Sequence, residues 1–361
     1  MNKIYFCKIS NHGSGLCNQF FSLITGIINA FKMGKKVIII DDFSNDYLKN
    51  DPIFFSSLID IDKFNEFLKI NYDMILIEKN NVNFTVKKVL YGYNGQYIDI
   101  TNKIIKFFIK GNTLNIGTDL HLNYFVGFDP CPSLQKNLKL IYNLNGINIE
   151  EDYDEYNCFL KNPIVFDILK SSFNYTFGWI NQIDRHMFDN ILKNLCPSDK
   201  FINVSETFLL DREIKTDDVI NVIHLRVEDD AIEHWSRMNN MAPKIFTEII
   251  INKYIRLIET YIDKNEHNII LSYNTNNPVI DYLSANNYKY YLIDKTEEGR
   301  EINAWTDLNI GRVANNVFIG NFNLVNLNGS TFSYYLLNYY NKDIKKVIID
   351  LDHIIENEKI Y

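Results

Sequence analysis

The chain has 361 residues, of which 46% are hydrophobic and 23% are charged. This composition excludes a disordered or membrane-embedded chain, and the length predicts two domains of ordinary size. A formal net charge of −8 argues against a nucleic-acid partner, because proteins that bind nucleic acids present a basic face.

The cysteines and the hydropathy pattern bear on the compartment. The five cysteines are irregularly spaced and form no Cys-x-x-Cys pair, so neither a disulfide framework nor a zinc site is indicated. No signal-peptide pattern is visible, and no segment reaches about 18 consecutive apolar residues. We therefore expect a cytoplasmic protein with reduced thiols and no stable membrane insertion.

The N-terminal segment has the pattern of a strand, a glycine-bearing turn, a helix and a second strand. We expect a strand over Lys3–Ile9, a turn over Ser10–Gly15, a helix from Leu16 to a C-cap at Gly34, and a strand over Val37–Ile40. This order is a βαβ unit, which predicts parallel strands. The apolar residues of the helix recur three or four positions apart, on one face: Leu16, Phe20, Leu23, Ile24, Ile27, Ile28 and Phe31.

Residues 45–196 mix short apolar runs with stretches rich in Asn, Tyr and Asp. We expect helices and irregular connections in this part of the chain, together with the side of a binding site that receives an acceptor.

The second half of the chain alternates strands with helices, which predicts a doubly wound α/β domain. Ligands of such domains bind beyond the carboxyl ends of the strands, so the polar residues that follow each strand are candidates for a site. The predicted strands are Asp218–Leu225, Asn268–Tyr273, Tyr288–Ile293, Val317–Ile319 and Val347–Asp350, and the predicted helices are Ile245–Ile262, Pro278–Ala285, Ile302–Asn315 and Thr331–Tyr340.

His224-Leu225-Arg226 ends the first of these strands. Alternate residues of a strand share a face, so His224 and Arg226 are expected to point the same way. A guanidinium offers a fixed fork of donors that suits a diphosphate, and it can stabilise negative charge on a departing nucleoside diphosphate. The alternative is that Arg226 only forms an ion pair with Glu228 or Asp229 at the end of the strand.

Two further turns favour anion binding. Gly329 precedes Ser330 and Thr331, which are expected to cap a helix whose free N–H groups favour an anion, although good caps occur without any ligand. The turn Gly13–Gln19 offers close approach of backbone to phosphate, with Asn18 as a side-chain donor. It lacks the third glycine of a dinucleotide site and a Walker lysine.

Weaker candidates follow other strands and helices. Asp307 is predicted either to accept from Arg226 or a hydroxyl, or to be an ordinary surface carboxylate. Asn274 follows a strand and is a candidate reader of a base edge. Asp-x-Asp pairs, which hold a divalent ion in metal-dependent glycosyltransferases, occur at Asp60/Asp62, Asp152/Asp154 and Asp350/Asp352; chance explains all three in a chain with 45 acidic residues.

Three of these segments resemble motifs of the fucosyltransferase superfamily, which includes α-1,2, α-1,6 and protein O-fucosyltransferases. They are the glycine turn that ends in Asn18-Gln19, the His224-Leu225-Arg226 segment, and the stretch from Asp307 to Ser330-Thr331-Phe332-Ser333. The order and spacing are similar, whereas residues 45–200 show no match. Relatives carry a second basic residue and an Asp after His-x-Arg, where this chain has Val227-Glu228-Asp229-Asp230.

The resemblance implies a GT-B fold of two facing Rossmann-like domains, here residues 1–205 on the acceptor side and 206–361 on the donor side. It implies GDP-fucose as first-choice donor, no cofactor, and inversion without a metal. Arg226 would hold the β-phosphate, His224 would lie near the nucleotide, and the Ser330–Phe332 backbone would cradle the diphosphate. Together with the residues that follow strands, the predicted donor-binding residues are Gly15, Asn18, His224, Arg226, Asn274, Asp307, Ser330, Thr331 and Phe332.

The predicted function is therefore transfer of a sugar to a hydroxyl of a glycan or glycoprotein. Arg226 is the predicted catalytic stabiliser, and Glu228 or Asp229 the predicted base that deprotonates the acceptor, with His12 as a further candidate. Two alternatives stay open: a transferase of the same fold with another nucleotide sugar, and a non-catalytic glycan-binding protein with a vestigial transferase fold.

Overall fold

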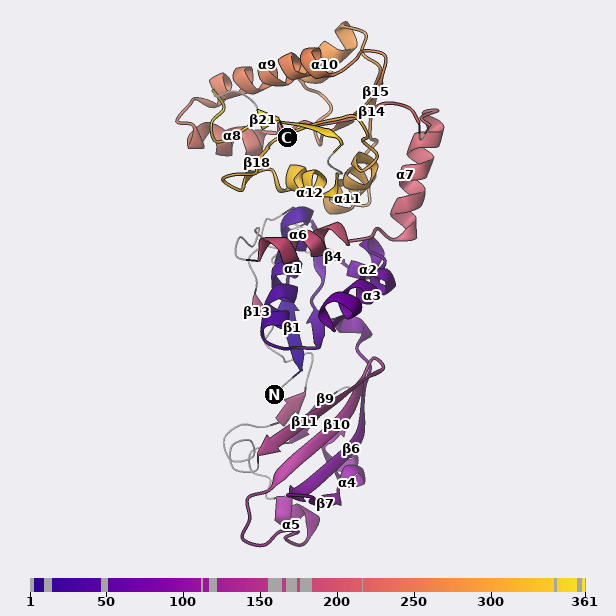
Figure 1. Cartoon of the computed structure of the whole chain (residues 1–361), viewed down its shortest axis with the longest axis vertical. Coiled ribbons are helices and arrows are strands. Elements are labelled where there is room, and N and C mark those ends of the chain that lie inside the picture. Colours follow the sequence, from indigo (N-terminus) through magenta and orange to yellow (C-terminus); the bar gives the residue numbers. More distant parts are fainter. Residues whose placement is uncertain are drawn as a thin grey trace. The chain divides into compact units, whose positions relative to one another are not determined.

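The computed structural model has a mixed α/β fold (Figure 1). It divides into two compact units. Unit 1 comprises Met1–Ile9, Thr25–Asp42 and Asn65–Thr176, and unit 2 comprises Ser10–Ile24, Phe43–Phe64 and Phe177–Tyr361. The structure describes residues 3–9, 15–46, 51–111, 113–116, 122–154, 164–166, 174–175, 184–215, 217–340, 343–355 and 359–360.

The first sheet of unit 1 confirms the parallel strands predicted for the N-terminal βαβ unit. Its order is β13 (Asn174–Tyr175), β1 (Ile4–Lys8), β2 (Val37–Ile40) and β5 (Ile75–Glu78), and all neighbours are parallel. Helix α1 (Leu16–Lys32) begins at the predicted residue. Gly34, with φ of 65°, turns the chain after it, as a C-terminal glycine should.

The second sheet of unit 1 shows that the expectation for the middle of the chain was wrong. Residues 84–154 include a four-stranded antiparallel sheet rather than helices and irregular connections alone. Its order is β11 (Ile147–Asp154), β10 (Asn137–Leu144), β6 (Phe84–Tyr93) and β7 (Gln96–Asp99).

The signals for this sheet were present in the sequence. Every second residue of β10 is buried, from Leu138 to Leu144, which is the period of a half-buried strand. Asn94-Gly95 and Asn145-Gly146 join adjacent strands with positive φ at both positions, which is the turn that tight hairpins favour.

The remaining elements before β14 are short strands and helices of up to 13 residues. The strands are β3 (Phe43–Asp46), β4 (Asp51–Ile53), β8 (Ile109–Lys110), β9 (Thr113–Ile116) and β12 (Ile164–Phe166), and the helices are α2 (Phe55–Leu58), α3 (Ile61–Tyr72), η1 (Lys79–Asn81), α4 (Thr101–Phe108), α5 (Leu122–Val126), α6 (Arg185–Lys193) and α7 (Asp199–Asp211).

Unit 2 contains the doubly wound sheet that the second half of the sequence predicts. Its order is β16 (Tyr290–Leu292), β15 (His267–Leu271), β14 (Ile220–His224), β17 (Val317–Gly320), β20 (Lys345–Ile348) and β21 (Lys359–Ile360). The first five strands are parallel, and β21 is antiparallel. In chain order this is 3-2-1-4-5-6, the strand order of Rossmann-type folds.

Helices cover both faces of this sheet (Figure 1). Helices α8 (Asp229–Met238), α9 (Pro243–Tyr261) and α10 (Pro278–Ala285) lie on one face, and α11 (Arg300–Gly311) and α12 (Thr331–Tyr339) lie on the other. A short hairpin, β18 (Phe322–Asn323) with β19 (Asn328–Gly329), connects β17 to α12. No helix in the described ranges is long and apolar enough to cross a membrane.

The strand order of unit 2 reverses direction between β14 and β17. In open α/β sheets the crevice at such a reversal, beyond the carboxyl ends of the strands, is where ligands bind. All five residues of β14 and all four of β17 are buried, so the first residues free to meet a ligand are those that follow each strand. Residues 224–230 and 321–333 are therefore the candidates for a binding site in unit 2.

Candidate functional site

His224 closes β14 in a buried position, where two contacts fix its ring. Its Nδ1 lies 2.7 Å from Oγ of Ser333, and its ring stacks on Phe332 with centroids 4.5 Å apart. Oγ of Ser333 also accepts the backbone N–H of Asn321 at 3.0 Å, so its own hydrogen is free to point at His224. With the Ser333 hydroxyl as the donor to Nδ1, the proton of the neutral imidazole lies on Nε2.

Burial keeps His224 uncharged. Loss of solvent, together with the neighbouring charge of Arg226, lowers the pKa of His224 to about 3. His224 therefore offers a neutral N–H donor rather than a second cation at neutral pH.

The backbone after His224 is held by a buried tyrosine. The Tyr254 hydroxyl donates to the carbonyl of His224 at 2.8 Å and accepts the N–H of Arg226 at 3.2 Å. The side chain of Asn321 donates to the same hydroxyl at 2.6 Å. Strand β14 thus ends in a fixed conformation, and Arg226 extends from a rigid base.

Arg226 forms ion pairs with two carboxylates. Its Nη1 lies 2.7 Å from Oε2 of Glu228, and its Nη2 lies 2.8 Å from Oδ2 of Asp230. The alternative of an ion pair at the end of the strand is thus confirmed for Glu228, whereas the second partner is Asp230 and not Asp229. Asp229 is exposed at the first position of α8, and α8 places Asp230 back toward the strand end.

Arg226 remains accessible despite these ion pairs, because its side chain is 27% exposed. Its charge lowers the pKa of Asp230, since the hydrogen bonds and attraction outweigh the partial burial of that carboxyl. An anionic ligand can therefore reach the guanidinium and compete with Glu228 and Asp230 for it.

The start of α12 presents backbone N–H groups rather than a side-chain cap. Ser330 occupies the N-cap position, but its side chain makes no capping hydrogen bond, so the predicted cap by this hydroxyl is wrong. The N–H of Ser330 instead donates to the carbonyl of Asn321 at 2.9 Å. Gly329 has φ of 129°, and a Cβ there would lie 2.8 Å from the same carbonyl oxygen, so only glycine fits.

The start of α1 approaches the start of α11 within unit 2. The N–H of Leu16 donates to Oε2 of the buried Glu301 at 2.6 Å, which caps the first turn of α1. A Cβ on Gly15 would lie 3.9 Å from Nη2 of Arg300, so this guanidinium borders the described end of the glycine turn. Arg300 also lowers the pKa of Asp230 by attraction, a smaller effect than that of Arg226.

Asn18 is placed one turn into α1. Its Oδ1 is buried and has no hydrogen-bond partner among the described residues. The rest of the predicted glycine turn, Ser10–Ser14, and with it His12, lies outside the described residues.

Asp307 and Asn274 form their hydrogen bonds away from Arg226, and only Asp307 was predicted to contact that side chain. Asp307 is buried and forms an ion pair with Lys295, whose Nζ lies 2.6 Å from its Oδ1, so both the predicted contact with Arg226 and the surface alternative are wrong. Burial outweighs the attraction of Lys295 and raises the pKa of Asp307 to about 6. Asn274 accepts the N–H of Asn276 at 2.9 Å and shapes its own loop.

Two residues that border the start of α1, Arg300 and Glu301, were not singled out from the sequence. Asp230 and Lys295 fall among the polar residues that follow predicted strands. Arg300 and Glu301 are the two residues before the predicted start of their helix, and nothing local marks their approach to Gly15.

Within the described ranges, no group of three or more His, Cys, Asp and Glu side chains is arranged to hold a metal ion. Each Asp-x-Asp pair has another partner. Asp60 pairs with Lys63, Asp152 lies 3.8 Å from Lys139, and Asp350 pairs with Lys359. Asp350 also accepts from Asn323 at 2.6 Å, and Asp352 accepts from Asn328 at 2.7 Å, so this last pair fixes the β18–β19 hairpin.

Comparison with known proteins gives structural likeness only. No family model and no curated protein matches the sequence. The chain is similar to the crystal structure of POFUT1 in complex with GDP-fucose, with 13% identity, a TM-score of 0.48, and coverage of 94% of this chain and 95% of that one. POFUT1 in complex with GDP gives 12% identity, a TM-score of 0.48 and 95% coverage of both chains.

A third similar structure is NodZ, an α-1,6-fucosyltransferase soaked with GDP-fucose, at 10% identity and a TM-score of 0.49, covering 100% of this chain and 99% of that one. Likeness at this level does not extend to a substrate or to a residue's role.

Proposed function

We propose that this chain is an inverting glycosyltransferase that transfers a sugar from a nucleotide sugar, with GDP-fucose as first choice, to a hydroxyl of a glycan or glycoprotein. The observation that carries the proposal is the position of His224 and Arg226. His224 is the last residue of β14 and Arg226 follows it, at the point where the Rossmann-type strand order reverses. His224 is also hydrogen-bonded to the first turn of α12.

Three kinds of donor at this position suit a diphosphate. Arg226 supplies a fork of N–H donors with a fixed positive charge, the start of α12 supplies free backbone N–H groups, and His224 supplies a neutral Nε2–H. A bound diphosphate would take the place of Glu228 and Asp230 as the partner of Arg226. Negative charge develops on the diphosphate as the sugar leaves, so donors that are already in place lower the barrier.

This chain lacks the second basic residue that follows His-x-Arg in the proteins it resembles, and Arg300 is a candidate for the same role. It borders Gly15 and acts on the carboxyl of Asp230, which Arg226 also contacts. We propose that Arg300 supplies the second positive charge for the donor, with Asn18 as a further polar contact from α1.

The base that deprotonates the acceptor is proposed to be Glu228 or Asp229. Glu228 is held by Arg226 at 2.7 Å, and it becomes free to accept a proton once the donor diphosphate occupies that guanidinium. Asp229 is exposed beside it and needs no such exchange.

The direct test measures the binding of nucleotide sugars through the change that each causes in the melting temperature of the purified chain. A GDP-sugar should raise the melting temperature of the wild type, because a ligand that binds only the folded state stabilises it. The same ligand should have little effect on Arg226→Ala. A shift with a UDP-sugar alone would replace the donor, and no shift with any nucleotide sugar would reject the transferase in favour of a non-catalytic glycan-binding protein.

A further inference from the structure

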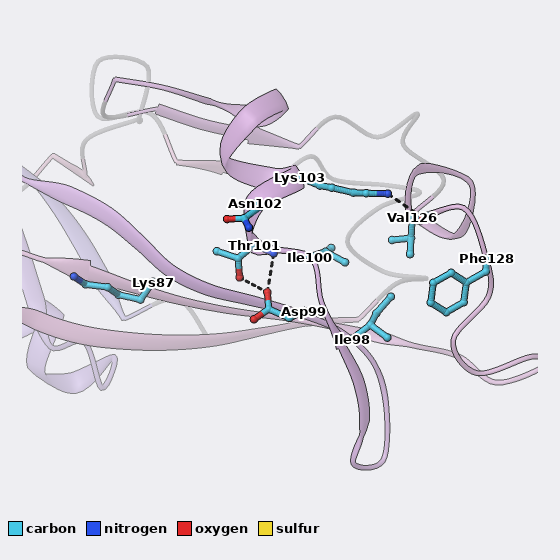
Figure 2. Close-up of a pocket in the computed structure, with 9 residues that line it drawn as sticks. All are labelled: Lys87, Ile98, Asp99, Ile100, Thr101, Asn102, Lys103, Val126 and Phe128. Atoms are coloured by element: carbon cyan, nitrogen blue, oxygen red, sulfur yellow. Dashed lines mark hydrogen bonds between the residues drawn. The ribbon is translucent and has the colours of Figure 1, made fainter.

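Unit 1 contains a hollow of about 590 Å³, and no residue of the candidate functional site lines it. Figure 2 shows its lining, which comes from β6, β7, the start of α4 and the segment that ends α5. Binding sites for small molecules have volumes of about 300–1,000 Å³, so the hollow has the capacity of a real site.

One side of the hollow is apolar. Figure 2 shows Ile98, Val126 and Phe128 gathered there. The Phe128 side chain is 56% exposed, so its ring offers an open face. An aromatic ring left in water at the edge of a hollow is a typical contact surface for a partly apolar ligand.

The loop that carries Phe128 is fixed. The N–H of Gly127 donates to the carbonyl of Asn123 at 3.0 Å, and Asp129 accepts the N–H of Cys131 at 2.9 Å. Asp129 also pairs with the buried Lys136 at 3.0 Å. A ligand that meets this ring therefore does not have to order the loop first.

The other side of the hollow offers hydrogen-bonding groups (Figure 2). Oδ1 of Asp99 accepts the N–H of Thr101 at 2.9 Å and its hydroxyl at 2.5 Å, whereas Oδ2 has no partner among the described residues. The hydrogen bonds from Thr101 lower the pKa of Asp99, so this carboxylate is ionised at neutral pH and is a strong acceptor. Asn102 adds an exposed amide beside it.

We propose that this hollow binds a neutral segment of an oligosaccharide, with the C–H face of one sugar against Phe128 and its hydroxyls bonded to Asp99 and Asn102. A carboxylate acceptor disfavours an anionic ligand. Lys103, which also lines the hollow, already donates to the carbonyls of Phe125 and Val126, at 3.2 and 3.0 Å. That the bound glycan is the acceptor rests on the proposed function, whereas saccharide binding itself does not.

The test is a printed array of neutral oligosaccharides without nucleotide sugar, followed by calorimetric titration of the strongest binder as a free sugar. Phe128→Ala and Asp99→Asn should each lower the affinity of the chain for this sugar about fivefold or more. Asn at position 99 keeps an oxygen for the N–H of Thr101, so α4 should start normally. Phe107→Ala is the matched control, because Phe107 is 57% exposed in the same unit and does not line the hollow; its affinity should equal that of the wild type.

The proposal is overturned if the wild type binds no neutral oligosaccharide, or if Phe128→Ala and Phe107→Ala bind alike. Binding of sulfated sugars alone, lost in Lys87→Ala, would also overturn it. Arg226→Ala should bind the oligosaccharide as the wild type does, and Phe128→Ala should keep the thermal shift with the nucleotide sugar. Failure of the hollow and failure of the donor site would therefore be told apart.

Discussion

One buried hydroxyl, Oγ of Ser333, lies 2.7 Å from Nδ1 of His224 and joins the end of β14 to the first turn of α12. The same oxygen accepts the backbone N–H of Asn321, which follows β17. A side chain on Gly320 would lie 2.8 Å from this oxygen, so the glycine at the end of β17 leaves room for it. The two strand ends and the proposed anion-binding helix are thus held in one arrangement.

Ser333→Ala should destabilise the chain by about 1–3 kcal/mol, because it leaves the imidazole Nδ1 and the N–H of Asn321 buried without a partner. Urea unfolding measures this. Ser236→Ala is the matched control, because Ser236 is equally buried. Its hydroxyl donates to the carbonyl of Glu233 within α8. That carbonyl keeps a second donor, the side chain of Arg237, when the hydroxyl is removed. Equal losses in the two variants would show that the Ser333 bridge has no special role.

Arg226→Ala should fold and lose about 10²-fold or more in kcat, since it removes a charge that stabilises the departing diphosphate. Arg226→Lys should recover only part of this, because an ammonium lacks the planar fork. Steady-state kinetics with the nucleotide sugar that gives a thermal shift measures both.

Arg237→Ala serves as the control for Arg226→Ala. Arg237 lies on α8 and is 74% exposed, and its side chain bonds only to Glu233 among the described residues. Its loss should leave kcat unchanged. A folded Arg226→Ala protein with near-normal turnover would remove Arg226 from the mechanism.

The stability of the chain should depend on pH through His224. Its pKa is about 3 in the folded chain and about 6.5 in the unfolded chain, so between these values the unfolded state binds more protons. This contribution is fully present above pH 6.5 and is lost as the pH falls toward 3. Between pH 6.5 and pH 5 the loss should be about 2 kcal/mol.

His224→Asn isolates this effect, because an amide replaces the imidazole without titrating. Urea unfolding at pH 7 and pH 5 should show a smaller loss of stability for the variant than for the wild type. Parallel changes in the two proteins would mean that His224 is accessible to protons in the folded chain.

Transferase activity should persist in EDTA, because Arg226, Arg300 and the start of α12 are proposed to carry the charge of the diphosphate. The assay compares turnover in EDTA with turnover in added Mn²⁺. Loss of activity in EDTA with recovery in Mn²⁺ would assign a metal to the site and return attention to Asp350 and Asp352.

The sequence by itself predicted the five parallel strands of unit 2 and its helices α9, α10, α11 and α12, but not α8. Its strands are short runs of apolar residues, such as Ile220–His224, and its helices show the three-to-four spacing, so local pattern and burial agree. It also located His224, Arg226 and the glycine turn before α12, because residues that follow strands in such a sheet converge on one edge. The antiparallel sheet of unit 1 was within reach too, through its Asn-Gly turns and the alternation along β10.

Only the tertiary structure decided which side chains meet. Ser333 is 109 residues from His224, and Glu301 is 285 residues from Leu16. Asp307 pairs with Lys295 rather than Arg226, and Arg300 reaches the glycine turn from another helix. Periodicity reports which face of a strand or helix is buried, but partners are chosen by the packing of elements distant in the chain, which no local pattern encodes.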